Sequence, residues 1–301
     1  MKIAAEKALI LSLCFLLGVV FAAAQSRRNV KTSEEGGTIL SLTVSRSDGK
    51  TEPIRLENLH LYENAVEQKI KNLSYDASPA RIVLLVDNSQ TIQPSIEQLQ
   101  AAVKEFAYEI FEGDEIFVVA YDEKPEIIQE WTDDAKKIEA SLATFRKQGN
   151  PHLFDALNAA ANEVLLPLMP GTRKTAVVLI SDGLDRGSKT NFENILAELQ
   201  NQNITLYALQ IPDRTGGAYR RNQPKAPAVI AQLTEGTGGR VFDFEESQVA
   251  AKTICDELRK NRYLLSYQPT NISTYDARRV FLVADEGISV RTKAVHPPNV
   301  K

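Results

Sequence analysis

An apolar run that ends in one acidic and two hydroxyl residues is the part of this sequence best suited to chemistry. The run is Ile82–Val86, and Asp87, Ser89 and Thr91 follow it at alternate positions. Five consecutive aliphatic residues predict a strand buried on both faces, as in the centre of a parallel sheet covered by helices. Ligands of open α/β sheets bind beyond the carboxyl ends of the strands, where these three side chains would lie. Their oxygen atoms are suited to binding a hard cation.

A second apolar strand offers another carboxylate. Residues Thr175–Ile180 are followed by a Ser-Asp-Gly turn, with the carboxylate at Asp182. Because the carboxyl ends of parallel strands meet at one edge of a sheet, we expect Asp87 and Asp182 to share a site. Oxygen ligands favour Mg²⁺ or Mn²⁺. Zinc is disfavoured, because the site offers no cysteine and only one nearby histidine, His152.

The two strand ends together resemble the von Willebrand factor type A domain. That family's metal-ion-dependent adhesion site uses Asp-x-Ser-x-Ser, a threonine from a later loop and the aspartate of a (Thr/Ser)-Asp-Gly turn. Asp87, Ser89 and Asp182 match this motif, and Thr91 retains the hydroxyl of the family's second serine. The resemblance implies that these four residues bind the metal. It also implies that a protein partner offers a carboxylate to the metal, and that the chain is a binding module with no catalytic residue.

The later loop departs from the family pattern. Relatives read roughly Gly-Gly-Thr-x-Leu-Tyr-Asp-Ala, whereas this chain has Pro151 in the threonine position. Proline has no side-chain oxygen, so one metal contact is missing. Asn150 could offer an amide oxygen instead, and His152 a ring nitrogen. A histidine near the start of a helix more commonly caps the helix or faces solvent.

Two other functions remain open from the sequence. The first is a structural scaffold with a degenerate, metal-free site, which the proline at position 151 would allow. The second is a phosphatase, because Asp-x-x-x-Thr after a buried strand also resembles haloacid dehalogenase-type phosphatases. In those enzymes a second aspartate stands two residues after the first, where this chain has Ser89. A serine cannot act as that carboxylic acid.

The ends and the composition of the chain predict an exported protein. Residues 1–24 combine Lys2 and Lys7 with an apolar run and a small-residue motif, Ala22–Ala24, which predicts a secretory signal peptide. Its removal would leave Cys255 as the single cysteine, so no intramolecular disulfide could form. Acidic residues outnumber basic ones by 39 to 35, which predicts attraction neither to nucleic acid nor to a membrane surface. We expect a secreted or bacterial envelope protein, with no membrane association after signal cleavage.

The pattern of apolar residues predicts an α/β domain between two β segments. Strands and helices alternate over residues 80–260, which indicates a doubly wound, mostly parallel, Rossmann-like sheet. Glu126–Trp131 is a candidate antiparallel edge strand. Residues 25–79 and 261–301 each contain too few strands to bury a face, so we expect them to pair into one flanking β-sandwich. Arg262–Pro269 and the pattern up to Ile70 also resemble the VWFA-related proteins common in Acidobacteria.

Other polar residues have structural interpretations. Asp155 would lie in the first turn of a helix, where the helix dipole favours a negative charge. Asp185, His60 and His296 are expected to face solvent. The basic loop 211–222 follows a strand, so it would emerge on the same face as the metal. There it could border a ligand surface, or it could be a solvated loop without a partner.

Overall fold

The computed structural model describes residues 37–48, 52–169, 171, 174–213, 223–270 and 275–298. The predicted signal peptide and most of the basic loop lie outside this part of the chain. Within it, no helix is both long enough and apolar enough to cross a membrane.

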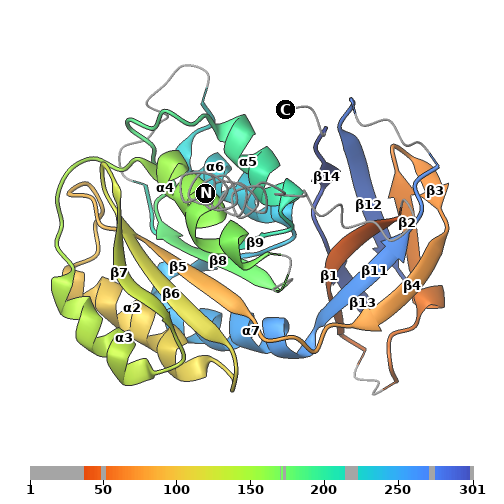
Figure 1. The fold of residues 1–301 in the computed structure, drawn as a ribbon, viewed down its shortest axis with the longest axis horizontal. Helices are drawn as coiled ribbons and strands as arrows, with labels where there is room; N and C mark the ends of the chain where they lie inside the picture. The colour runs from red at the N-terminus through yellow and green to blue at the C-terminus, as the bar shows by residue number, and fades with distance from the viewer. Residues whose placement is uncertain are drawn as a thin grey trace, which may run out of the picture. The chain divides into compact units, whose positions relative to one another are not determined.

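A six-stranded sheet forms the centre of the α/β domain (Figure 1). Its strands, in spatial order, are β10 (Val241–Asp243), β9 (Thr205–Gln210), β8 (Thr175–Ser181), β5 (Arg81–Asp87), β6 (Glu115–Tyr121) and β7 (Pro125–Thr132). The first five strands are parallel, and β7 pairs with β6 in the antiparallel direction. The predicted sheet and its antiparallel edge strand are therefore confirmed.

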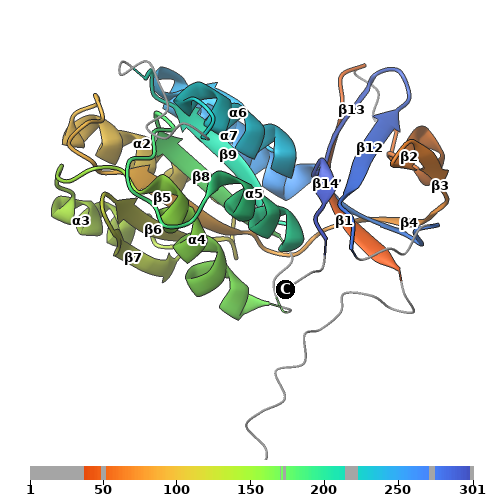
Figure 2. The ribbon, with the colours of Figure 1, turned by 90° about the horizontal axis from the view of Figure 1, so that it is seen from above.

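Helices cover both faces of this sheet (Figures 1 and 2). One face packs against α2 (Ile96–Glu109), α3 (Ala135–Ser141) and α7 (Ser247–Lys260), and the other against α4 (Leu153–Ala159), α5 (Phe192–Asn201) and α6 (Ala226–Thr237). The central strand shows why the aliphatic run is uninterrupted. Leu84 packs into the core on the face covered by α2, α3 and α7, and Leu85 into the core on the face covered by α4, α5 and α6. Both are fully buried.

Two further sheets enclose a separate apolar core. One has the order β13 (Ile288–Arg291), β1 (Thr38–Arg46), β11 (Arg262–Tyr267), β4 (Ile70–Tyr75). The other has the order β14 (Val295–His296), β12 (Arg278–Ala284), β2 (Leu59–Glu63), β3 (Val66–Gln68). Each sheet combines strands from both ends of the chain, because β1 pairs with β11 and β2 pairs with β12. The flanking β-sandwich is thus confirmed, while the domain boundaries at residues 80 and 260 stay predictions.

Several elements differ from the sequence-based expectations. The apolar pattern of residues 133–146 predicts one continuous helix, whereas α3 ends at Ser141 and the chain continues only as a 3-10 turn, η3 (Leu142–Thr144). After α4 the chain forms a π-helical segment, η4 (Ala160–Leu165), which helical periodicity does not distinguish from an α-helix. The short strand β14 was not predicted, because two residues give no detectable alternation. The structure also contains three short 3-10 segments: η2 (Leu56–Asn58), η5 (Leu166–Leu168) and η6 (Phe244–Glu246).

Candidate metal centre

The four predicted ligands lie in two loops at one edge of the central sheet. Asp87 ends β5, and Asp182 follows the last residue of β8, the strand that pairs with β5 in parallel. Asp87 and Ser89 are fully buried, and Asp182 is only 4% exposed. The Ser89 and Thr91 hydroxyl oxygens are 3.0 Å apart. The fold therefore places the carboxylates side by side, with the paired hydroxyls in the loop that follows Asp87.

Two hydroxyls that the sequence did not single out hold Asp87 in place. The Tyr121 hydroxyl, at the end of β6, and the Ser181 hydroxyl each donate to Asp87 Oδ2 over 3.3 Å, and Tyr121 also donates to Ser181 Oγ over 2.9 Å. The backbone N–H of Ser89 donates to Asp87 Oδ1 over 2.9 Å. A signal was present, because Tyr121 and Ser181 are the last residues of strands adjacent to β5.

Burial and mutual repulsion make this site unfavourable for negative charge. Burial, and then the nearby Asp182 carboxylate, raise the pKa of Asp87 to about 7. Burial also raises the pKa of Asp182, with a further contribution from Asp213. A divalent cation between the two carboxylates would offset this cost, because its positive charge stabilises their ionised forms.

Asp182 offers an oxygen to a ligand. Its Oδ1 accepts the backbone N–H of Leu184 over 2.9 Å, whereas its Oδ2 has no hydrogen-bond donor in the part of the chain that the structure describes. Gly183 shapes this turn with a φ of +82°, and a Cβ there would lie 2.4 Å from the carbonyl oxygen of Ala226. Only glycine fits this position without strain or displacement.

The third loop of the site, which contains Pro151 and His152, is held to its neighbours by backbone hydrogen bonds. The Pro151 carbonyl accepts the backbone N–H of Arg186 over 2.7 Å, and the His152 N–H donates to the Asp122 carbonyl over 2.9 Å. The His152 ring packs against Gly187, since a Cβ at Gly187 would lie 2.0 Å from His152 Nε2. Pro151 therefore fixes the loop beside the Asp182 turn without offering a side-chain ligand.

Two expectations about solvent exposure were wrong. Asp185 is 1% exposed: its Oδ1 accepts the Phe154 N–H and the Ser188 hydroxyl. His296 is 7% exposed and lies 3.0 Å from the Tyr267 hydroxyl, inside the β-sandwich. In both cases tertiary hydrogen bonds make burial of the polar group tolerable, and the local sequence contains no sign of these partners.

The expected structural role of Asp155 agrees with its contacts. Its carboxylate accepts the backbone N–H groups of Lys189 and Thr190, which ties the start of α4 to the loop after Asp182. These hydrogen bonds hold its pKa below the usual range despite partial burial.

The donor set fits a small hard cation. It contains two carboxylates and two hydroxyls, and Asp182 Oδ2 remains available. Among the described residues, no group of three or more His, Cys, Asp or Glu side chains is arranged to hold a metal. A cation at this edge would therefore depend on the Ser89 and Thr91 hydroxyls and on water to complete its shell.

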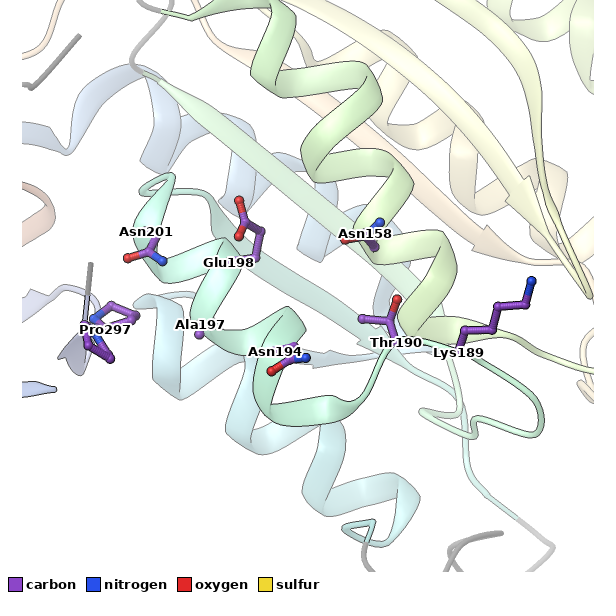
Figure 3. A pocket seen from close by; sticks show the side chains of 9 residues that line it. Asn158, Lys189, Thr190, Asn194, Ala197, Glu198, Asn201 and Pro297 are labelled. Carbon is purple, nitrogen blue, oxygen red and sulfur yellow. The ribbon is translucent and has the colours of Figure 1, made fainter. Parts of the chain in front are cut away.

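A cavity elsewhere on the surface has a different character. It has a volume of about 630 Å³ and lies along α5 and the Pro297–Pro298 segment (Figure 3). Its lining includes the amides of Asn158, Asn194 and Asn201 but none of the four predicted ligands. We therefore place the candidate site at the strand ends, where carboxylates converge, rather than in this cavity.

Comparison with known proteins agrees with the resemblance seen in the sequence. Residues 82–184 match the family model of the von Willebrand factor type A domain, which confirms the resemblance for the segment from β5 to the turn after β8. No curated protein matches the chain. The further likeness to Acidobacteria-type relatives stays a prediction.

Three solved structures are similar to this chain at low sequence identity. A von Willebrand factor type A protein from Catenulispora acidiphila is 12% identical, with a TM-score of 0.50, and the match covers 89% of this chain and 76% of that one. An aerotolerance-related membrane protein from Bacteroides fragilis is 19% identical, with a TM-score of 0.46 and coverage of 60% and 99%. Proximal thread matrix protein 1 from the mussel byssus, with a zinc-occupied MIDAS motif, is 15% identical, with a TM-score of 0.47 and coverage of 64% and 48%.

Proposed function

We propose that this chain, whose residues 82–184 match the von Willebrand factor type A domain, is an exported binding module that depends on a divalent cation. Asp87, Ser89, Thr91 and Asp182 would hold Mg²⁺ or Mn²⁺, and a carboxylate of a protein partner would take an open position on the metal. The observation that supports this proposal most is the pair of buried carboxylates at adjacent strand ends, each with a raised pKa.

The cation would supply positive charge that the site itself lacks. Asp87 and Asp182 would neutralise it, and the Ser89 and Thr91 hydroxyls would add neutral oxygens. Tyr121 and Ser181 orient Asp87 through their hydrogen bonds to Oδ2. The contact of Pro151 with Arg186 would keep the third loop in position beside the proposed metal site.

Metal binding should stabilise the folded chain. Mg²⁺ or Mn²⁺ binds the folded state and not the separated loops, so a hundredfold excess over the dissociation constant adds about 2.7 kcal/mol to the free energy of unfolding. We expect a rise in melting temperature on addition of Mg²⁺ and its reversal by EDTA. Asp133 is an exposed aspartate that is not one of the four predicted ligands. The control variant Asp133→Asn should therefore respond to Mg²⁺ as the unaltered chain does. Calorimetry that shows no heat, together with an unchanged melting temperature at millimolar metal, would reject the proposal.

The proline at position 151, where the family has threonine, should limit the affinity for Mg²⁺. Pro151→Thr restores a side-chain oxygen, so we expect about tenfold tighter Mg²⁺ binding by calorimetry, equivalent to roughly 1.4 kcal/mol. His152→Ala should change affinity little, because the ring packs on Gly187. If Pro151→Thr has no effect while Asn150→Ala weakens binding, the Asn150 amide already fills the position. A larger loss in His152→Ala than in Asn150→Ala would indicate a nitrogen ligand instead.

A further inference from the structure

The outer face of the sheet β14-β12-β2-β3 exposes two large apolar side chains among charged ones. Residues of β12 alternate between the two faces: Val280 belongs to the core of the β-sandwich, whereas Phe281 and Val283 point outward and are 66% and 38% exposed. Tyr62 and His60 occupy the outward positions of β2. An exposed phenylalanine beside a valine and a tyrosine on the open face of a sheet is a typical interaction feature.

Strand register arranges the outward side chains in two rows across the sheet. Phe281 lies opposite Tyr62, which lies opposite Glu67 of β3. Val283 lies opposite His60, and the alternation of β3 continues to the exposed Lys69. Outside these rows are Arg279 at one end of β12 and Asp285 just beyond its other end, and both are exposed. We call these eight residues the β2–β12 face; in sequence order they are His60, Tyr62, Glu67, Lys69, Arg279, Phe281, Val283 and Asp285.

We propose that the β2–β12 face binds the same face of a second copy of this chain. A twofold axis in the plane between the two sheets, perpendicular to the strands, reverses the order of the rows. The row of Phe281 then lies over the row of Val283 of the other copy, as in an aligned sheet packing.

The charges on the face are self-complementary under this symmetry. Glu67 of one copy lies over Lys69 of the other, and Arg279 lies over Asp285, so each oppositely charged pair occurs twice. A face with balanced charge of this kind does not attract an anionic surface or a strongly charged partner. Within the chain, His60 Nδ1 is 3.7 Å from Glu67 and His60 Nε2 is 3.9 Å from Asp285. Asp285 Oδ2 also accepts the Asn58 amide over 2.9 Å. Exposed contacts of these types contribute little, so Glu67 and Asp285 can still pair with a second copy.

The size of the face predicts a weak dimer. The strands β12, β2 and β3 have seven, five and three residues, or roughly 24, 17 and 10 Å of length, and lie about 4.8 Å apart, so their footprint is below that of a standard protein interface. We therefore expect dissociation in the micromolar range, governed by burial of Phe281 and Tyr62, because aromatic residues dominate interface energies.

Sedimentation velocity of the purified chain across a concentration series tests this proposal. We expect a monomer–dimer equilibrium that EDTA does not change, because the face contains none of the metal ligands. Phe281→Ser should weaken the dimer at least tenfold, whereas Ile127→Ser, which alters a side chain of 59% exposure on β7, should not. Melting temperatures of both variants would show that the fold is retained. A chain that stays monomeric into the hundred-micromolar range, or a dimer unaffected by Phe281→Ser, would overturn the proposal.

Charge exchange tests the twofold arrangement itself. Glu67→Lys places two lysines over two lysines, and Lys69→Glu places two glutamates over two glutamates, so each variant alone should be monomeric. An equimolar mixture of the two variants restores both ion pairs and should form a heterodimer. If the mixture stays monomeric while the unaltered chain dimerises, this symmetry is wrong.

Discussion

Asp87→Asn should abolish the effect of Mg²⁺ on the melting temperature and stabilise the metal-free protein at neutral pH. Asparagine keeps the size of the carboxyl group, and its amide oxygen can accept the Tyr121 and Ser181 hydroxyls. Its NH2 group cannot accept the Ser89 N–H, so the loss of that hydrogen bond offsets part of the stabilisation. The amide carries no charge to bind a cation. The variant should therefore fold and lose metal-dependent partner binding. Loss of solubility would instead show that Asp87 is a structural residue.

The stabilisation follows from the direction of the pKa shift. The pKa of Asp87 is about 7 in the folded chain, against an ordinary value of 3.8 in the unfolded chain. As pH rises, the Asp87 carboxyl group therefore loses its proton first in the unfolded chain. The stability of the metal-free protein should thus fall between about pH 4 and pH 7, by on the order of 4 kcal/mol from this group. Thermal unfolding across this range, with and without Mg²⁺, should show the decrease in the unaltered chain and in Asp133→Asn, but a much smaller one in Asp87→Asn. Mg²⁺ should oppose the decrease, because it competes with the proton. A parallel decrease in all three metal-free proteins would mean that other groups control the pH dependence.

Gly183→Ala should both destabilise the fold and weaken metal binding. A side chain at this φ of +82° costs roughly 1–2 kcal/mol, and the close approach to the Ala226 carbonyl adds to that cost by displacing the turn that carries Asp182. We expect a loss of more than about 2 kcal/mol in chemical denaturation and at least a tenfold weaker affinity for Mg²⁺.

Gly113→Ala separates the two causes of this effect. Gly113 has a similar φ of +86°, yet a Cβ there would meet only Pro79 at 3.5 Å, an ordinary contact. That variant should show the conformational cost alone and bind Mg²⁺ normally. Equal losses of stability in the two variants would show that contact with α6 is unimportant, and unchanged affinity in Gly183→Ala would separate the turn from the metal site.

The sheet and its strand-end acids could be predicted because they depend on local pattern. Val83 and Leu84 point to opposite faces, and an apolar residue at every position of a strand has few other interpretations. The position of Asp182 relative to Asp87 then follows from the parallel pairing of their strands. Expectations of this kind need no knowledge of how individual side chains pack.

The missed features depend on contacts between distant residues. Tyr121 stabilises the position of Asp87 through a hydroxyl that could equally have faced solvent, and burial of Asp185 depends on the N–H of Phe154. His296 is buried only because Tyr267 and Glu63 meet it inside the β-sandwich. Sequence periodicity describes which face a residue occupies, but it does not identify the partner that makes a buried polar group tolerable.

Pairing of β1 with β11 has a kinetic consequence. Thr38 lies opposite Tyr267, so this strand pair joins residues 229 positions apart in the sequence (267 − 38). Closing so long a loop is entropically costly and slow, whereas the parallel crossovers of the α/β domain join nearer segments. We expect refolding in two phases, with protection of amide hydrogens in β5 and β8 before those in β1. A nascent chain would hold β1 without a partner until β11 has been synthesised, so assembly of the β-sandwich becomes the last step of folding.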